Sequence, residues 1–474
     1  MSDIGAPGSF VSGPVSIENV ALLTDLYEIT MAAVYFRRRM DGLATFSLFA
    51  RKLPAARGFL VAAGLEDVLN YLHGYRFSER ALSYLESLDR FDAEFIDFLS
   101  RLRFTGRVRA VAEGTVVFAD EPLLEITAPI VQAQLVESAV LNLVHLQTVL
   151  ASEAARVVLA ASGRPVVEFG LRRTHGLETG MRAARCAYIA GAEMSSNVLA
   201  GLTYGIPPTG TMAHSYVSAF PEEIESFRAF AESFPSSTTL LLDTYDTVSA
   251  AHKAVIVAKE MEARGSRLQS VRLDSGDLLA LSRAVRRILD EAGLDYVRIF
   301  ASGGLDEDEL ARLVSAAAPI DAFGVGTRMT TSADAPYLDI AYKLVRYDGR
   351  DVLKLSAGKE TWTGEKQVYR SLADDNFVGD LIALRDEPLP EGNSVPLLEE
   401  VMREGRRASS HPSLMAVREH CAAQLRKLPP RVRQLRGFAA YPVRYSPALI
   451  ARQRAAEREA AAREIASTTS VVAR

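Results

Sequence analysis

Polar residues follow a short apolar run in VRLDSGDL, and their types suit a phosphorylated sugar. Alternation along a strand puts Arg272 and Asp274 on one face, with Ser275 and Asp277 in the turn that follows. Carboxylates beside a hydroxyl suit a ribose diol or a hydrated Mg²⁺ ion, and the guanidinium suits a carboxylate or a phosphate. A helix N-cap with a local ion pair explains the same residues equally well, so this stretch alone leaves both readings open.

Two glycine-rich turns suit phosphate. SGGL (302–305) and GVGTR (324–328) offer backbone N–H groups near helix starts, with no side chain to block a ligand. Ordinary turn geometry explains either turn alone, but two on consecutive strands favour a phosphate site. The residues that we expect to approach phosphate are Gly303, Gly304, Gly326 and Thr327.

Two further stretches carry possible functional groups. EFGLRR places Arg172 and Arg173 at a strand end, where burial without an anionic partner would be costly, unless one of them points to solvent. GTMAHS contains His214, with no second histidine, cysteine or carboxylate at metal-ligand spacing. Such a histidine is more often a core residue, but beside phosphate and ribose loops it becomes a candidate for catalysis.

The elements that must position these residues alternate in type from Pro165 onward. Seven short apolar runs are each followed by a polar turn and a helical stretch, which predicts parallel strands joined by right-handed crossovers. We therefore expect an irregular, TIM-like α/β barrel. The polar residues fall at the carboxyl ends of the predicted strands, where barrel enzymes build their sites. An open doubly wound sheet would place the same loops at the same edge.

The remaining segments predict a second, α/β domain. A helix is expected over 22–36, a strand over 44–54, and strands around an Asp348-Gly349 turn within 340–370 that return to the N-terminal domain. The expected organisation is a disordered N-terminus (1–15), an N-terminal α/β sandwich domain (16–150), the barrel (151–335), the returning strands (336–385) and a C-terminal helical extension and tail (386–474).

The composition is that expected of a soluble globular protein. The chain has 474 residues, 48% of them hydrophobic, and a net charge of −5, so nothing favours nucleic acid or a membrane as partner. Its two cysteines form no CxxC pair, which argues against a disulfide framework and a cysteine zinc site. We see no secretory signal or transmembrane segment, and expect a cytoplasmic protein.

The motifs together resemble one family. The chain carries, in order, LLTDLYEITM, FARKLP, GLEDVL, EFGLRRTHG, SSNVLAG, GTMAHS, LLLDTYDT, VRLDSGDL, GVGTR and LKLSAGKETWTGEKQVYR. It thereby resembles the nicotinate phosphoribosyltransferases over roughly residues 20–375. The resemblance implies a type II phosphoribosyltransferase fold, with a barrel and a sandwich domain built from both chain ends.

The resemblance implies roles for matching motif positions. His214 matches the histidine that ATP transiently phosphorylates, and Thr211 matches a residue of the nicotinate site. Arg272 matches the arginine associated with nicotinate. Tyr27, in LLTDLYEITM, matches a tyrosine that closes on the pyridine ring from the neighbouring subunit of a homodimer.

Two further positions match, and two depart from the family pattern. Thr327 matches a residue that binds the ribose-phosphate donor, and Arg172 matches an active-site arginine. His175 stands where the family usually has glutamine, and we expect it to keep a hydrogen bond rather than act as a second catalyst. Gly304 stands where the family often has an acidic residue, so no metal role is assigned there.

The implied reaction converts nicotinate and phosphoribosyl pyrophosphate into nicotinate mononucleotide and pyrophosphate, coupled to ATP hydrolysis. This ATP-coupled step, formally that of a ligase, is the first of NAD salvage from nicotinate. Mg²⁺ and the co-substrate ATP are expected, with no metal ligand assigned. Nicotinamide phosphoribosyltransferase is the nearest alternative, although the arginines favour the anionic acid. A barrel that binds NAD precursors without turnover is the second alternative.

Overall fold

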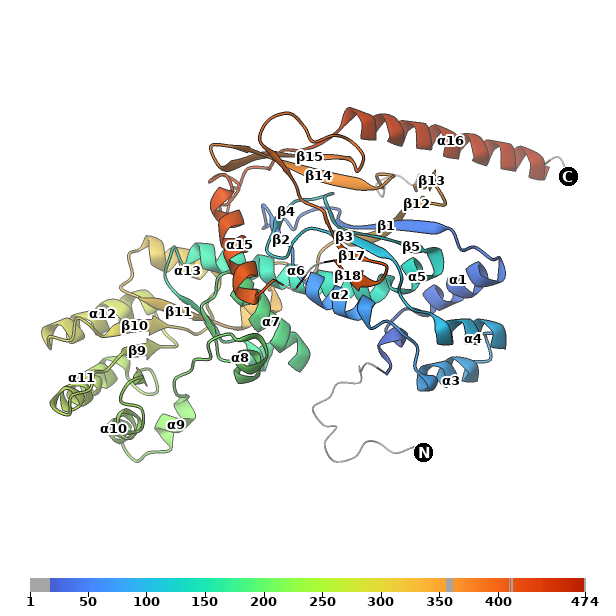
Figure 1. The fold of residues 1–474 in the computed structure, drawn as a ribbon. Helices are drawn as coiled ribbons and strands as arrows, with labels where there is room; N and C mark the ends of the chain where they lie inside the picture. Colours follow the sequence, from blue (N-terminus) through green and yellow to red (C-terminus); the bar gives the residue numbers. More distant parts are fainter. Residues whose placement is uncertain (1–17, 355–360, 409, 411, 473–474) are drawn as a thin grey trace. The chain divides into compact units, whose positions relative to one another are not determined.

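Two units make up the protein, which is described here from a computed structural model. The structure describes residues 18–354, 361–408, 410 and 412–472. Unit 1 combines the two chain ends, up to Thr148 and from Tyr337, and unit 2 is the continuous segment Val149–Pro336. The expected disordered stretch 1–15 lies outside the described residues. Figure 1 shows both units with their elements labelled.

An antiparallel sheet forms the centre of unit 1. Its strand order is β13-β12-β1-β5-β3-β17-β18, so a segment from beyond the predicted barrel pairs with the first strand of the chain. The central strand β1 (Leu43–Ala50) is buried at every position after the first, as its apolar sequence LATFSLFA requires. The other strands of this sheet are β3 (Arg107–Ala110), β5 (Pro122–Pro129), β12 (Ile340–Tyr347), β13 (Arg350–Asp351), β17 (Glu399–Arg403) and β18 (Arg406–Arg407).

The predicted turn at Asp348-Gly349 is confirmed. β12 and β13 pair as a hairpin on either side of it, and the φ angles of Asp348 and Gly349 are +48° and +74°. Two consecutive left-handed residues are what a tight hairpin demands, and an Asp-Gly pair adopts them readily. The local sequence therefore determines this connection.

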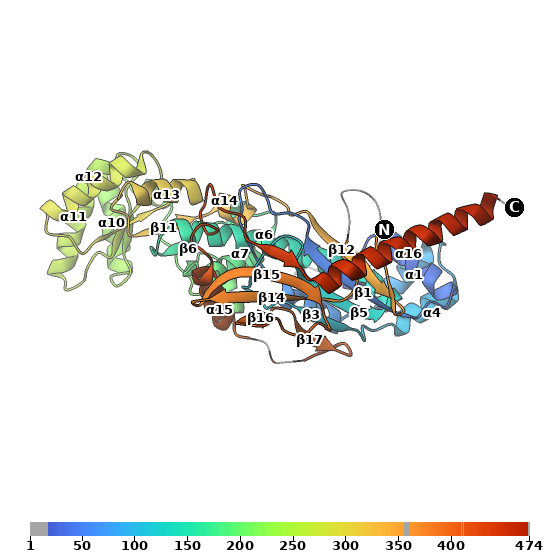
Figure 2. The ribbon, with the colours of Figure 1, turned by 90° about the horizontal axis from the view of Figure 1, so that it is seen from above.

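A second sheet completes unit 1, in the order β16-β14-β15-β19. The buried guanidinium of Arg370 ties it together, because Nη2 donates to Asp380 Oδ2 at 2.6 Å and Nη1 donates to the carbonyl of Val116. Figure 2 shows α16 running beside β15, and the two elements are in contact. The strands are β14 (Lys366–Ala373), β15 (Asn376–Leu384), β16 (Ser394–Pro396) and β19 (Val443–Tyr445), and a small pair is formed by β2 (Leu60–Val61) and β4 (Val116–Val117).

Helices cover the remaining surfaces of unit 1. The first begins at Leu26 rather than at Leu22, because residues 20–22 form a short 3₁₀ helix instead. The C-terminal part is not only helical as expected, since four strands (β16 to β19) lie within it. The helices are α1 (Leu26–Arg37), α2 (Leu65–His73), α3 (Glu79–Ser87), α4 (Ala93–Arg101), α5 (Ile130–Leu135), α15 (Leu414–Lys427) and α16 (Pro447–Val472).

One long helix, α6 (Glu137–Ala160), crosses the boundary between the units in sequence. By length and composition alone it could span a membrane. However, 72% of its most apolar window is buried inside the structure, as in a core helix. Its apolar character is explained by packing within the protein.

A parallel sheet forms the centre of unit 2, in the order β7-β6-β11-β10-β9-β8. Each strand is followed by a crossover helix, as the alternating rhythm predicts. Among the described residues, β7 and β8 stand at the two edges of this sheet. The strands are β6 (Val166–Glu168), β7 (Met194–Ser195), β8 (Thr239–Leu241), β9 (Ser270–Leu273), β10 (Arg298–Ala301) and β11 (Ala322–Val325).

The prediction of a seventh strand, in GTMAHS, is wrong. This segment is a loop that runs into the short helix α9 (His214–Ser218), and only Pro208 forms an isolated bridge with Ser195. Pro207 and Pro208 lack the N–H groups that a strand ladder needs, which explains the loop. The loop leaves His214 at a helix start instead of within a strand.

Side-chain caps begin most crossover helices of unit 2. Asp277 accepts hydrogen bonds from the N–H groups of Leu279 and Ala280, so this residue of VRLDSGDL is the N-cap of α12. Asn197, Asp246 and Asp306 cap their helices in the same way. The helices are α7 (Leu177–Ala190), α8 (Val198–Tyr204), α10 (Glu223–Ser233), α11 (Thr247–Ala263), α12 (Leu278–Glu291), α13 (Glu307–Ser315) and α14 (Thr327–Thr331).

Candidate active site

Arg272 is the centre of a hydrogen-bonded network at the carboxyl edge of the parallel sheet. Its Nε donates to Ser302 Oγ at 2.8 Å, Nη1 to Thr211 Oγ1 at 3.0 Å and Nη2 to Asp274 Oδ1 at 2.6 Å. The guanidinium also lies 5.4 Å from the ring centroid of Phe169. Three loops are thus held by one side chain, which explains why a planar fork occupies this position.

Asp274 links this network to the histidine. Ser302 Oγ donates to Asp274 Oδ1 at 2.5 Å, and Asp274 Oδ2 lies 3.7 Å from His214 Nε2. Burial opposes ionisation of Asp274, but the hydrogen bond from Ser302 and the charge of Arg272 outweigh it and lower the pKa of this carboxyl. Asp274 therefore presents a negative charge to the imidazole.

His214 is not a core histidine. Its side chain is 45% exposed, and its Nδ1 lies 3.2 Å from the hydroxyl oxygen of Thr244. With Asp274 at one nitrogen and a hydroxyl at the other, the ring orientation is set by two partners. The alternative of a buried structural role is excluded by this exposure.

The two glycine turns lie beside this network. Gly303 has φ +88°, and a Cβ there would stand 1.6 Å from the backbone oxygen of Asp274, so only glycine fits. A Cβ on Gly326 would lie 2.9 Å from the backbone oxygen of Phe169. Gly304 also has a positive φ, +66°, but faces open space. Close backbone approach thus requires glycine at positions 303 and 326.

A hollow of about 360 Å³ joins these turns to the arginines. Arg328 pairs with Asp306, whereas the guanidinium groups of Arg172 and Arg173 have no hydrogen bond or ion pair to any residue within the described ranges. Two arginines facing a cavity without counter-ions favour an anionic ligand. The hollow is lined by Phe169, Arg172, Arg173, Arg272, Asp274, Ser302, Gly303, Gly304, Leu305, Gly324, Gly326, Thr327 and Arg328.

A second, more apolar hollow of about 630 Å³ lies next to the first. Phe169 lines both, and Thr211 and Phe300 line the second. The second hollow also reaches the amino ends of the strands, because the first residues of β8, β9, β10 and β11 line it. Its aromatic walls suit a flat ring. The geometry thus provides a place for an aromatic substrate next to one for phosphates.

Some of the residues predicted from sequence lie away from the 360 Å³ hollow. Ser275 is exposed and donates its hydroxyl to Asp243 Oδ2 at 2.5 Å. Thr211 and His214 reach the network only through Arg272 and Asp274. Tyr27 belongs to α1 in unit 1, where 52% of it is exposed and burial of its hydroxyl raises its pKa.

Sequence reasoning missed several partners. Ser302, Asp243 and Thr244 all follow predicted strands, so the strand-end rule that found Asp274 could also have found them. Phe169 is apolar, so the search for polar residues at strand ends could not find it. That it lines both hollows is visible only in the folded structure.

One acidic cluster in unit 2 is already neutralised in part. Carboxylate oxygens of Glu153, Glu307 and Asp334 lie within 4.8 Å of one another. Arg156 donates to Glu307 Oε1 at 2.9 Å and lies 3.8 Å from Glu153. A buried guanidinium supplies the charge that a metal ion would otherwise bring, so we assign no metal site there.

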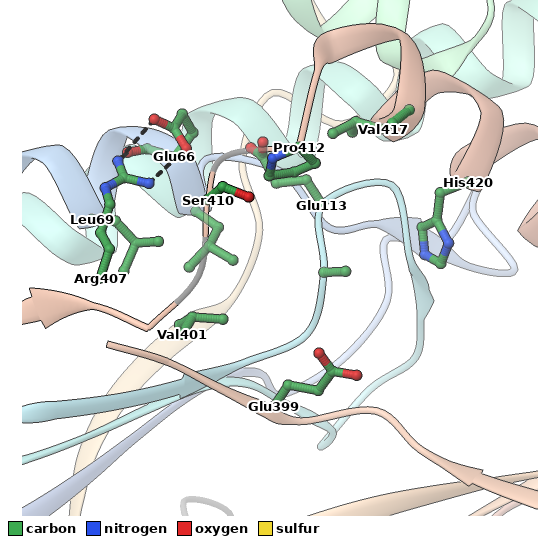
Figure 3. Close-up of a pocket in the computed structure, with 13 residues that line it drawn as sticks. Glu66, Leu69, Glu113, Glu399, Val401, Arg407, Ser410, Pro412, Val417 and His420 are labelled. Carbon is green, nitrogen blue, oxygen red and sulfur yellow. Dashed lines mark hydrogen bonds and ion pairs between the residues drawn. The ribbon is translucent and has the colours of Figure 1, made fainter. Parts of the chain in front are cut away.

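A separate hollow lies in unit 1 and is shown in Figure 3. Among the side chains that line it, Glu66 and Arg407 pair with each other at 2.8 Å. The Nε2 atom of His420 lies 3.0 Å from the hydroxyl of Thr115. Its polar groups are largely partnered, and none of the residues predicted from sequence lines it. The chemistry is therefore sought in unit 2.

The comparisons agree with this assignment. Family models for the nicotinate phosphoribosyltransferase N-terminal domain, the family itself and the C-terminal domain match residues 22–145, 165–378 and 393–453. The nicotinate phosphoribosyltransferase pncB2 of Mycobacterium tuberculosis is 50% identical over 91% of this chain and 92% of that protein. The Bacillus subtilis nicotinate phosphoribosyltransferase is 41% identical, over 78% of this chain and 77% of that protein.

Solved structures give the same answer. Human nicotinic acid phosphoribosyltransferase superposes with a TM-score of 0.83 at 30% identity, over 91% of this chain and 99% of the human chain. A structure described as nicotinate-nucleotide pyrophosphorylase, from Pyrococcus furiosus, superposes with a TM-score of 0.73 at 25% identity, over 88% of this chain and 98% of that one. By sequence, fold and the residues gathered at the sheet edge, this chain belongs to the nicotinate phosphoribosyltransferase family.

Proposed function

We propose that the chain transfers phosphoribose from phosphoribosyl pyrophosphate to nicotinate and couples the transfer to ATP hydrolysis through His214. Family membership makes it an enzyme of NAD biosynthesis. The observation that carries the site assignment is the network of Arg272, Asp274 and His214 beside two arginines without counter-ions. The products are nicotinate mononucleotide, pyrophosphate, ADP and phosphate.

The transfer itself needs orientation and charge stabilisation. The ring nitrogen of nicotinate attacks C1 of the ribose, the bond from C1 to the pyrophosphate oxygen breaks, and its electron pair leaves with pyrophosphate. The ionised carboxylate of Asp274 favours the positive charge that develops on the ribose. The N–H groups of the two glycine turns, with Arg172 and Arg173, favour the charge on pyrophosphate.

Arg272 acts mainly as a positioning residue in this scheme. All three of its nitrogens already donate to Ser302, Thr211 and Asp274. The fork fixes the loops around the 360 Å³ hollow and supplies positive charge near the nicotinate carboxylate.

The imidazole of His214 can take the γ-phosphoryl group of ATP. The negative charge of Asp274, 3.7 Å from Nε2, favours the tautomer with the proton on Nε2, which leaves the lone pair on Nδ1 as the nucleophile. Nδ1 attacks the γ-phosphorus, the bond to the bridging oxygen breaks and ADP leaves. Water later attacks the phosphohistidine and releases phosphate. Such a cycle drives synthesis only when phosphorylation changes substrate affinity.

The oxygen groups near the site fit Mg²⁺. Asp243 Oδ1 is buried and has no hydrogen-bond partner among the residues that the structure describes, and Oδ2 accepts from Ser275. Mg²⁺ is held in proteins by one or two carboxylates together with substrate phosphates. Asp243 would hold the ion, which would supply charge neutralisation for the phosphates.

We infer an irregular α/β barrel in unit 2 and an α/β sandwich in unit 1, supported by the likeness to the human enzyme. A homodimer is supported by the apolar side chains that α8 exposes, with Leu202 84% and Val198 74% accessible. Tyr27 of the partner subunit would then complete the site. A cytoplasmic location follows from the cysteine use and the substrates.

The decisive experiment measures mononucleotide formation with nicotinate or nicotinamide, each with and without ATP. We expect product from nicotinate and stimulation by ATP. In His214→Asn the ATP effect and acid-labile phosphate on the protein should vanish, while slow ATP-independent turnover remains. Preference for nicotinamide would point to the sister activity, and binding without product would support a non-catalytic precursor-binding protein. Complete loss of turnover in His214→Asn would show that coupling and transfer are not separable.

A further inference from the structure

A row of four polar side chains crosses the central sheet of unit 1, far in sequence from the residues discussed above. Direct cross-strand pairing places Arg346 of β12 opposite Thr45 of β1, Thr45 opposite Thr127 of β5, and Thr127 opposite Arg107 of β3. Directly opposed residues share one face of a sheet. Two hydroxyls are therefore flanked on both sides by guanidinium groups.

The row opens into a hollow of about 460 Å³. Thr45 Oγ1 and Thr127 Oγ1 lie 2.9 Å apart at its floor, and the rim carries Arg385 and Arg403 besides the two arginines of the row. The hollow is lined by Leu43, Thr45, Thr105, Gly106, Arg107, Thr127, Ala128, Pro129, Arg346, Gly349, Glu365, Arg385, Arg403 and Glu404.

Positive charge exceeds negative charge in this hollow. Its lining holds four arginines against two glutamates, Glu365 and Glu404, and one of the arginines, Arg403, pairs with Glu400 outside the lining. Glu365 accepts from Arg107 at 2.8 Å and from Arg385 at 2.7 Å, and lies 3.6 Å from Arg346. These three guanidinium groups are only 26% to 35% exposed, so water screens their repulsion incompletely. One glutamate cannot balance them.

The arginines of the hollow also affect the buried guanidinium of Arg109. Burial lowers the pKa of Arg109; Glu125 opposes this, while the charges of Arg385 and Arg107 lower it further. Glu125 in turn lies 3.6 Å from Arg109 and 3.3 Å from Lys366, so it is shared between two cations. Positive charge thus continues from the hollow to the buried pair Arg109 and Lys366.

We propose that this hollow binds a small molecule carrying two or more phosphate groups, at a site separate from the candidate active site. Arginine forks match phosphate oxygens bidentately, and the threonine hydroxyl that does not donate to its neighbour adds a neutral donor between them. The volume suits inorganic pyrophosphate or the phosphate chain of a nucleotide. A bound polyanion would offset the repulsion among the three arginines and would stabilise unit 1 through mass action.

Hydrogen–deuterium exchange of the full-length protein, with pyrophosphate and ATP as separate probes, tests the proposal site by site. We expect protection in the turns 102–107, 347–350 and 403–406, in addition to any protection in 302–305 and 324–328. In Arg346→Glu, protection of the turns 102–107, 347–350 and 403–406 should require at least a tenfold higher probe concentration. Any protection of 302–305 and 324–328 should be unchanged. Arg403→Glu, at a 72% exposed side chain, should weaken it as well.

Controls separate this site from the active site and from misfolding. Arg80→Glu reverses one exposed charge on α3 and should leave every segment as in the wild type. Melting temperatures of all variants, measured without anion, show whether unit 1 folds. Protection by pyrophosphate identifies the phosphates as the recognised group, and protection by ATP alone identifies a nucleotide. If neither probe protects these turns, or both arginine variants keep the protection within twofold, the proposal is wrong.

Discussion

Arg272 Nη2 donates to Asp274 Oδ1 at 2.6 Å across the carboxyl end of β9, and the same carboxylate lies 3.7 Å from His214. Through this contact Arg272 both fixes the loops and holds the charged carboxylate of Asp274 beside the histidine. We expect Arg272→Lys to lower kcat/KM for nicotinate on the order of 100-fold, because lysine keeps the charge but cannot hold three loops at once.

The measurement for Arg272→Lys is steady-state kinetics with nicotinate varied at saturating phosphoribosyl pyrophosphate. Arg283→Lys, on α12, is the matched control, because its side chain donates to the carbonyl of Ala316 away from the site. An Arg272→Lys enzyme within threefold of wild type would contradict the positioning role.

The glycine pair 303–304 offers an internal comparison. Both residues have a positive φ, but a Cβ on Gly303 meets the backbone of Asp274 at 1.6 Å, whereas one on Gly304 meets nothing within 4 Å. We expect Gly304→Ala to cost about 1 kcal/mol of unfolding free energy, the usual cost of left-handed backbone, and to keep most activity. Gly303→Ala should cost at least about 2 kcal/mol more and abolish activity, because backbone must move.

Urea unfolding and activity of the two alanine variants check this. Equal effects at the two positions would mean that backbone conformation, and not the contact with Asp274, shapes the phosphate turn.

The carboxyl of Asp274 makes the free energy of unfolding depend on pH in the acidic range. Its folded pKa is lowered, so the ionised form stabilises the folded state above the unfolded pKa of about 3.9, and this contribution is lost as the pH falls through the folded value. Asp274→Asn should therefore unfold more easily than wild type at pH 6. The difference should shrink below about pH 4. Urea midpoints at pH 3, 4, 5 and 6 measure it, and a constant difference would refute the assignment.

The carboxyl of Glu137 changes stability with pH in the opposite direction. Burial and the nearby charge of Glu28 raise its pKa to about 7, so the folded state favours the protonated form and loses stability as the pH rises from about 4.3 to 7. Glu137→Gln should remove this loss, on the order of 3 kcal/mol.

Urea midpoints between pH 5 and 8 test this prediction. The profile of Glu137→Gln should be flatter than that of wild type, and Glu86→Gln, at an exposed position on α3, should leave it unchanged. A Glu137→Gln profile parallel to wild type would show that the carboxyl titrates normally.

The apolar surface of α8 predicts self-association. Leu202→Lys places a charge on a side chain that is 84% exposed, so it should leave the melting of the monomer nearly unchanged. Sedimentation should show a shift from dimer to monomer, with loss of activity. Val378→Lys, on an exposed β15 position in unit 1, is the control. A variant that keeps the dimer would place the interface elsewhere.

The sequence by itself determined the kinds of element and the residues at their ends. Alternating apolar runs and helical stretches predicted the parallel sheet of unit 2, and the strand-end rule brought forward Arg272, Asp274 and the glycine turns. Local chemistry also determined the Asp348-Gly349 hairpin. These features are decided by periodicity and backbone conformation, which are properties of neighbouring residues.

Only the tertiary structure decided which distant residues meet. That Arg272 contacts Thr211 and Ser302, that Thr244 faces His214, and that Arg346 shares a row with Arg107 depend on pairings between segments from 30 to more than 200 residues apart. Strand register and loop packing are set by the whole core, because a shift of one residue moves every side chain to the opposite face. The charge balance of a cavity is therefore visible only after folding.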